Sequence, residues 1–260
     1  MNAEPVDLAV TQLGSGPPII VLHGLLGRAR NWLSIARALE PSYALHLADL
    51  RNHGGSPWAD AMDYPAMAGD IAALIERLDV GPVRVVGHSM GGKVAMTLAL
   101  TRPELVERLV IVDIAPIPYI HGYEDLIAAM LAVPLETASR RVDVDTALRA
   151  AVPDAGLRGF LMQNLELAAG RLSWQPNLKV LLRTMPQLTG FPAALAGTTY
   201  TGRVNCLRGA TSSYVDPAGE SALRQYFPAA IVDTVPDAGH WPHAERPASF
   251  LRLLEPALAA

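Results

Sequence analysis

Short apolar runs alternate with amphipathic segments of helical length over the first 113 residues. The apolar runs have the length of buried strands and are expected at residues 18–22, 43–47, 83–86 and 109–112. The intervening segments repeat their apolar residues with helical spacing, which predicts helices at residues 31–40, 64–78 and 90–100. Strands that are apolar on both faces and separated by helices are typical of a parallel sheet covered on both sides. The pattern therefore predicts an α/β fold.

The pattern changes after Asp113. The next 80 or so residues show only helical periodicity and no convincing strand, with helices expected at 123–133, 146–152, 157–169 and 178–185. Strand and helix then alternate again, at 204–207, 217–226, 230–235 and from about 244 onward. The simplest interpretation is an α/β core formed by residues 1–115 and 196–260, with a helical cap (lid) of residues 116–195 inserted into it.

Composition narrows the class of protein. Half of the 260 residues are hydrophobic and 18% are charged, which excludes a disordered or fibrous chain. The net charge is −4 and no run of Lys or Arg occurs, so we expect no nucleic-acid partner. Cys206 is the only cysteine, which rules out an intrachain disulfide. The first residues lack a secretory signal and no apolar run approaches the ~20 residues of a membrane span, so we expect a soluble, cytoplasmic protein.

The central motif is G-H-S-M-G at residues 87–91, between a predicted strand and a predicted helix. A sharp turn from strand to helix exposes the serine, and the flanking glycines give that turn room. The start of the helix also directs backbone N–H groups and a positive dipole at an incoming oxyanion. The motif predicts Ser89 as a nucleophile.

The same segment satisfies most of a phosphate-binding P-loop. Gly87 and Gly92 are followed by Lys93, but Val94 stands where Ser or Thr would bind magnesium. The apolar run that ends in Asp113 could serve as the acidic motif of such an ATPase. This interpretation leaves two further motifs, at residues 23–27 and around His240, without a role, so we do not favour it.

The H-G-L-L-G segment at residues 23–27 follows the first clear strand. Its glycines let the backbone approach a ligand closely. The N–H of Leu25 would then join that of Met90 in an oxyanion hole. The alternative is an ordinary glycine-rich turn.

A serine nucleophile needs a general base, and seven histidines compete for that role. His240 follows a predicted strand and precedes the last helix, and we take it as the base, with His243 in reserve. The remaining histidines belong to turns, to a strand core or to loops that could line a pocket: His23, His46, His53, His88 and His121.

The chain resembles the α/β-hydrolase family over nearly its whole length. Three motifs carry this resemblance: the turn at 23–27, the elbow G-H-S-M-G-G at 87–92 and the segment G-H-x-x-H-x-E-x-P at 239–247. The resemblance implies an α/β-hydrolase fold: a mostly parallel central sheet, helices on both faces and a helical cap inserted after the sixth strand. It also implies a Ser–acid–His triad, with the acid between Ser89 and His240 in the chain.

The position of the acid is a choice between two aspartates. The usual place after the seventh strand of the family holds Ser212, which cannot balance an imidazolium. Asp113 ends the preceding strand of the core, at the same sheet edge as the elbow, and we prefer it because a strand end is rigid. Asp216 lies four residues beyond the usual place and is the alternative. Ser212 would then support the aspartate and His240 by hydrogen bonding.

The arrangement resembles one subgroup, the YbfF-type esterases and their mitochondrial relatives. D-L-R-N-H-G-G-S at 49–56, D-I-A-P at 113–116 and S-x-Y-V at 212–215 carry this likeness. It implies esterase or thioesterase activity on acyl chains, with Tyr214 near the substrate. The subgroup anchors substrate with a lid arginine near position 123, whereas residues 121–124 here read H-G-Y-E. The candidate substrate-binding residues are His23, Gly24, His88, Tyr214 and Trp241.

These inferences predict a serine hydrolase that cleaves carboxylic esters or thioesters through an acyl-enzyme, without a metal or organic cofactor. Ser89 does not suit the aspartate-nucleophile dehalogenases and epoxide hydrolases of the same fold. Serine enzymes that cleave C–C, lactone or amide bonds or make peracids remain alternatives, because fold does not fix the substrate. A non-catalytic binding protein of this fold is a further alternative.

Overall fold

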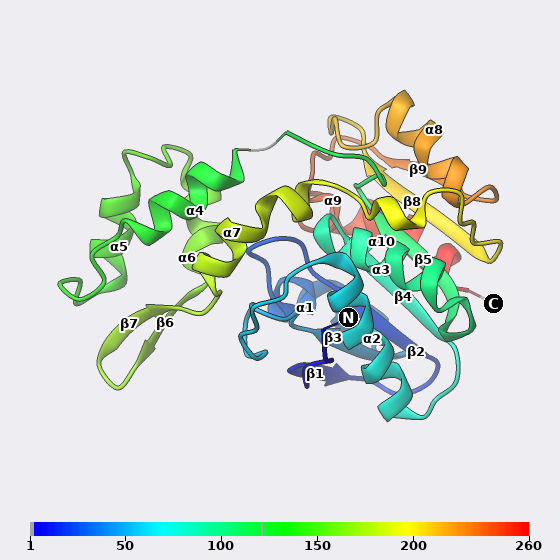
Figure 1. The fold of residues 1–260 in the computed structure, drawn as a ribbon, viewed down its shortest axis with the longest axis horizontal. Helices are drawn as coiled ribbons and strands as arrows, with labels where there is room; N and C mark the ends of the chain where they lie inside the picture. Colours follow the sequence, from blue (N-terminus) through cyan, green and yellow to red (C-terminus); the bar gives the residue numbers. More distant parts are fainter. Residues whose placement is uncertain (1–2, 121, 260) are drawn as a thin grey trace.

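A seven-stranded, mostly parallel sheet runs through the molecule in the order β1-β3-β2-β4-β5-β8-β9 (Figure 1). The computed structural model describes residues 3–120 and 122–259. The strands are β1 (Val10–Leu13), β2 (Pro18–Leu22), β3 (Ala44–Ala48), β4 (Val83–His88), β5 (Val106–Val112), β8 (Arg203–Gly209) and β9 (Ile231–Val235). β1 is antiparallel to β3, and all other pairs are parallel. The predicted α/β-hydrolase fold is confirmed.

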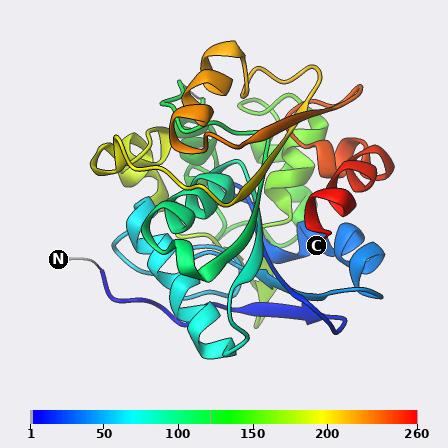
Figure 2. The same ribbon diagram turned by 90° about the vertical axis from the view of Figure 1, so that its right-hand side faces the viewer.

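Helices cover both faces of the sheet (Figure 2). The core helices are η1 (Ala29–Trp32), α1 (Leu33–Leu39), α2 (Tyr64–Leu78), α3 (Met90–Thr101), η2 (Pro103–Leu105), α8 (Pro217–Tyr226), α9 (Pro242–Glu245) and α10 (Pro247–Leu258). Successive side chains of β2 point to opposite faces of the sheet. Ile19 and Val21 pack with α1 and α10, while Ile20 and Leu22 pack with α2 and α3. This two-sided burial explains why the strands read as unbroken apolar runs.

We call the segment between β5 and β8 the cap; its helices α4 to α6 and its hairpin lie on the left of Figure 1, and α7 runs from there towards the sheet. It contains α4 (Tyr123–Leu131), α5 (Arg141–Leu148), α6 (Ala155–Met162), β6 (Leu165–Ala168), β7 (Arg171–Trp174), α7 (Leu178–Thr189) and η3 (Ala193–Leu195). The expectation of a strand-free cap is wrong, because β6 and β7 pair as an antiparallel hairpin. Ala169 and Gly170, both at positive φ, turn the chain, and Leu172 and Trp174 alternate inward. The helix expected at 157–169 therefore ends at Met162.

Other boundaries also differ from the expected ones. The helix expected at 146–152 lies at Arg141–Leu148, because the Asp143 carboxylate caps its first turn by accepting from the N–H of Arg140. The edge strand β1 was not expected, since its residues are only partly buried. The last helix is split into α9 and α10. The resemblance implied a cap after the sixth strand. Within residues 3–120 the cap follows the fifth strand, β5, because only one strand, β1, precedes β2.

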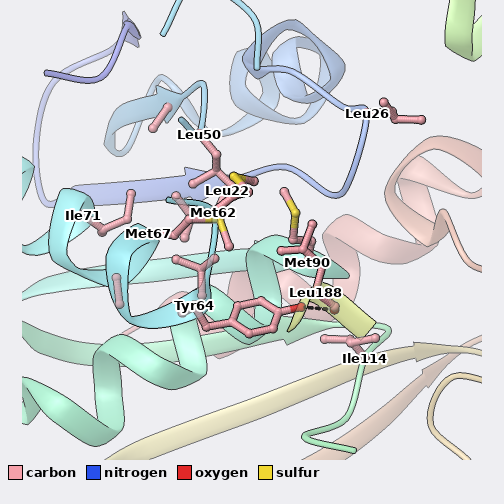
Figure 3. Packing of buried hydrophobic residues seen from close by; sticks show 14 of the residues in the cluster. Leu22, Leu26, Leu50, Met62, Tyr64, Met67, Ile71, Met90, Ile114 and Leu188 are labelled. Carbon is pink, nitrogen blue, oxygen red and sulfur yellow. Dashed lines mark hydrogen bonds between the residues drawn. The ribbon is translucent and has the colours of Figure 1, made fainter. Parts of the chain in front are cut away.

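Near the carboxyl ends of the parallel strands, buried hydrophobic side chains of the cap pack against those of the sheet and its helices (Figure 3). Met90 of α3, Ile114 after β5 and Leu188 of α7 lie in one buried cluster. The hydroxyl of Tyr64 in α2 donates to the carbonyl of Leu188 at 2.6 Å, the dashed line in Figure 3. Within the described ranges, no helix is long and apolar enough to cross a membrane.

Candidate active site

Ser89 occupies a strained turn between β4 and α3. Its backbone has φ 52° and ψ −120°, outside the regions that a residue with a Cβ usually adopts, and its N–H donates to the Val112 carbonyl at 3.0 Å. The flanking glycines allow this turn: a Cβ on Gly91 would lie 2.5 Å from the carbonyl oxygen of His23, and one on Gly87 would overlap the carbonyl of Gly91. The G-x-S-x-G pattern is therefore a steric requirement of the turn.

A chain of hydrogen bonds joins Ser89, His240 and Asp113. His240 Nε2 lies 3.0 Å from Ser89 Oγ, and His240 Nδ1 lies 2.8 Å from Asp113 Oδ2. A carboxylate only accepts, so Nδ1 carries the proton and the Nε2 lone pair faces the serine hydroxyl. This is the arrangement in which an imidazole can take a proton from serine.

The two candidate acids have different partners. Asp113 is fully buried just after β5, where its Oδ1 accepts from the N–H of Gly209 at 2.8 Å and its Oδ2 accepts from Ser212 Oγ at 2.5 Å. Asp216 instead caps α8, with its Oδ1 accepting from the N–H of Gly219 at 2.7 Å. Of the two, Asp113 is the aspartate that contacts His240.

The turn after β2 lies beside the serine. The Gly24 carbonyl accepts from the N–H of Gly27 at 2.9 Å and from His23 Nδ1 at 2.8 Å, which fixes the peptide between Gly24 and Leu25. The N–H of Leu25 points away from that carbonyl, as in any trans peptide. Met90 is the first residue of α3, so its N–H has no intrahelical acceptor. Leu25 and Met90 both line a small cavity next to Ser89.

Three buried histidines support these elements in their neutral form. His53 Nε2 accepts from the N–H of Leu26 at 3.2 Å, and His88 Nε2 donates to the carbonyl of His240 at 2.7 Å. Burial and the neighbouring His23 lower the pKa of His53 to about 3, and burial lowers the pKa of His88 well below its usual value. Burial also lowers the pKa of His23. His53 is thus part of the scaffold beneath the turn and not a cavity wall.

The aromatic candidates surround His240. Tyr214 stacks on the imidazole, with ring centroids 3.7 Å apart, and lines neither of the two cavities at the site. Trp241 meets the imidazole edge-on at 5.3 Å and lines the larger cavity. His243, the reserve base, is buried against Trp32 at 4.3 Å. His240 is therefore the candidate base that reaches Ser89.

Ser89 lies where two cavities meet. The larger one has a volume of about 1490 Å³ and opens between the cap and the core, and His23, Gly24 and His88 line it. The smaller one, of about 20 Å³, is mostly apolar. The sequence did not identify three arginines on the wall of the larger cavity, Arg28 and Arg30 from the core and Arg141 from α5. His121 lies outside the described residues.

Lys93, the lysine of the alternative P-loop reading, is buried under the cap. Its ammonium donates to the carbonyls of Ile117, Thr189 and Gly190 at 2.8, 3.0 and 2.6 Å. All three hydrogens are thus used inside the protein, where a P-loop lysine would reach a phosphate. Among residues 3–120 and 122–259, no three His, Cys, Asp or Glu side chains are grouped to hold a metal ion.

Comparisons with known proteins agree with this geometry. The model of a family described as alpha/beta hydrolase fold matches residues 17–247. The chain is 40% identical to mouse "sn-1-specific diacylglycerol lipase ABHD11" over 251 residues, 94% of this chain and 81% of that protein. It is 32% identical to "Esterase YbfF" of Escherichia coli (strain K12) over 238 residues, 91% of each chain. A solved structure titled "Marine microorganism esterase" has a TM-score of 0.93 and 33% identity, covering 97% of this chain and 100% of that chain.

Proposed function

The chain belongs to the α/β-hydrolase fold family and is an ester-bond hydrolase of the YbfF type, and from this premise we propose that Ser89, His240 and Asp113 form its catalytic triad. The observation that carries the proposal is the hydrogen-bond chain from Ser89 Oγ through the imidazole to the buried carboxylate, at 3.0 and 2.8 Å. It lies at the wall of a cavity large enough for an organic ester.

In the first half-reaction, Ser89 Oγ attacks the carbonyl carbon of the ester while His240 Nε2 takes the hydroxyl proton. The tetrahedral intermediate collapses as the imidazolium gives that proton to the leaving alcohol, and the acyl group remains on the serine. Asp113 keeps the proton on Nδ1 and stabilises the imidazolium by its charge.

In the second half-reaction, water takes the place of the alcohol. His240 Nε2 removes a proton from the water as its oxygen attacks the acyl carbon. The second tetrahedral intermediate then releases the carboxylic acid, and the proton returns from the imidazolium to Ser89 Oγ. The enzyme is thereby regenerated without a further reactant.

Charge that develops on the carbonyl oxygen would be held by the N–H groups of Leu25 and Met90. Two features support this assignment. The peptide between Gly24 and Leu25 is fixed by two donors to its carbonyl. The N–H of Met90 stands at the positive end of α3, beside the nucleophile.

The substrate is proposed to be a carboxylic ester or thioester with a bulky group. The volume of about 1490 Å³ supports this, since it exceeds the usual range of small-molecule pockets. The relative named as a diacylglycerol lipase makes an acylglycerol a reasonable member of that class. A reaction without a cofactor and a cytoplasmic location remain predictions from the sequence.

The experiment that tests the proposal is hydrolysis of p-nitrophenyl esters from acetate to palmitate by the full chain. Ser89→Ala is the control, and labelling with a fluorophosphonate reports the reactive serine directly. We expect hydrolysis and labelling in the wild type and neither in Ser89→Ala. A folded wild type that hydrolyses no ester and takes no label would overturn the triad. It would favour a binding role, whereas labelling without ester hydrolysis would favour C–C or amide cleavage by Ser89.

A further inference from the structure

The turn that carries Leu25 is held by the buried side chain of Leu26 and by hydrogen bonds to its backbone. The carbonyl of Gly24 has two donors, and the N–H of Leu26 donates to His53 Nε2 at 3.2 Å. Leu26 itself lies at φ 57°, a left-handed conformation that a residue with a Cβ adopts only when its surroundings impose it. The position of the Leu25 N–H therefore depends on what holds Leu26.

One of the groups that holds Leu26 comes from the cap. Asn164 Nδ2 donates to the carbonyl of Leu26 at 2.7 Å. Asn164 stands between α6 and β6, and its own backbone is anchored there: its N–H donates to Leu161 and its carbonyl accepts from the N–H of Gln175. Leu26 thus has a hydrogen-bond partner from the core at its N–H and one from the cap at its carbonyl.

The side chain of Asn164 is fully buried, yet only half of its amide is used. Its Oδ1 has no hydrogen-bond partner among the described residues. A buried polar atom without a partner costs about 1–3 kcal/mol, so an apolar side chain of similar size would serve packing at least as well. The feature that only the amide supplies is the N–H to the carbonyl of Leu26.

We propose that Asn164 is a positioning residue that makes the oxyanion hole depend on the seated cap. This inference rests on the proposed function, because it takes the N–H of Leu25 as an oxyanion donor. Without the Asn164 bond, the carbonyl of Leu26 loses the donor that the cap supplies, and only the core contacts of the turn oppose relaxation of its left-handed conformation. The adjoining peptide then turns, and the Leu25 N–H no longer meets the developing oxyanion.

The expected effect is on the chemical step. Removal of an oxyanion donor lowers kcat about 100- to 1000-fold, so displacement of one donor should lower it about 10- to 100-fold. The substrate carbonyl is uncharged in the ground state, so KM should change less than about threefold. A boronic acid that forms a tetrahedral adduct with Ser89 should lose affinity by the same factor as kcat/KM.

The test compares Asn164→Leu, which keeps the number and branching of the side-chain heavy atoms but has no donor, with Asn164→Ala, which removes the amide without adding bulk. Trp58→Phe is the matched control, because Trp58 Nε1 donates to the cap carbonyl of Gln175 at 2.9 Å, a contact between core and cap whose acceptor lies outside the turn. Both Asn164 variants should lose kcat and boronate affinity with little change in thermal midpoint. Trp58→Phe should keep kcat within about twofold.

Three results would overturn the inference. Wild-type kcat in a folded Asn164→Leu or Asn164→Ala would remove the positioning role. An equal loss in Trp58→Phe would mean that any cap contact matters. A raised KM with unchanged kcat would point to substrate binding instead. A wild type without esterase activity would count against the triad itself, so the two failures are distinguishable.

Discussion

Replacing the Asp113 carboxylate by an amide is the most direct test of how His240 is oriented. The Gly209 N–H donates to Asp113 Oδ1, so an asparagine would keep its oxygen at that position and place its NH₂ group where Oδ2 now lies. The NH₂ group would then face His240 Nδ1, which at present donates to Oδ2 at 2.8 Å. Nδ1 would have to become the acceptor, and the ring proton would move to Nε2.

The size of the effect follows from that tautomer. With a proton on Nε2, the imidazole cannot accept the proton of Ser89 Oγ, 3.0 Å away. The same change of tautomer in other Ser–His–Asp triads lowers kcat by about 10⁴. That factor corresponds to about 5 kcal/mol of transition-state stabilisation. We therefore expect Asp113→Asn to lose about four orders of magnitude in kcat while the fold is retained.

The assay is hydrolysis of p-nitrophenyl butyrate, with the rate of fluorophosphonate labelling as a second measure of serine reactivity. Asp216→Asn is the matched control, since Asp216 caps α8 and asparagine caps helices about as well as aspartate. Its kcat should stay within about twofold of the wild type. The reverse ranking, an inactive Asp216→Asn beside an active Asp113→Asn, would refute the assignment of the acid.

Three further predictions concern the surroundings of the triad. Ser212→Ala removes a hydrogen bond to the charged Asp113, worth about 1.5 kcal/mol, and should lower kcat about 10-fold; an unchanged kcat would contradict this. Lys93→Met leaves three buried carbonyls without their donor and should lower the free energy of unfolding, measured by urea denaturation, by about 3 kcal/mol or more. Unaltered stability would show that the ammonium does not anchor the cap. Burial lowers the pKa of His243 from about 6.5 to about 3. As the pH falls from 6.5 towards 3, the imidazole therefore gains a proton in the unfolded chain but not in the folded one, and the wild type loses stability. His243→Phe should remove this part of the loss, about 2 kcal/mol between pH 7 and pH 5, and an equal acid sensitivity in both proteins would contradict the prediction.

The sequence predicted those parts of the fold that have strong local signals. The strands of the sheet centre are buried on both faces, so the apolar run Pro18–Leu22 and the helix Tyr64–Leu78 lie where their patterns indicated. The edge strand β1 and the hairpin of β6 and β7 were missed because their residues are partly exposed and their apolar pattern is weak. In the hairpin, the turn at Ala169 and Gly170 overrode the helical spacing of the preceding residues.

The residues of the site likewise include some that the sequence predicted and some that it did not. Ser89, His240 and Asp113 could be named from the sequence because they follow strand ends within recognisable motifs, and the structure brings them into contact. The supporting contacts of Asn164 and Lys93 could not be found. Both side chains bond to backbone carbonyls far away in the chain, 138 residues away for Asn164, and a carbonyl leaves no signal in the sequence.

The anchors of the cap also bear on how substrate reaches Ser89. Lys93 binds the segment that leaves the core at Ile117 and the segment that returns at Thr189 and Gly190. Lifting the whole cap would strip a buried ammonium of all three acceptors, each costing about 1–3 kcal/mol. The base of the cap is therefore the part that resists movement. The large cavity already opens between the cap hairpin and η1, so access through this opening leaves Lys93 and its acceptors in contact.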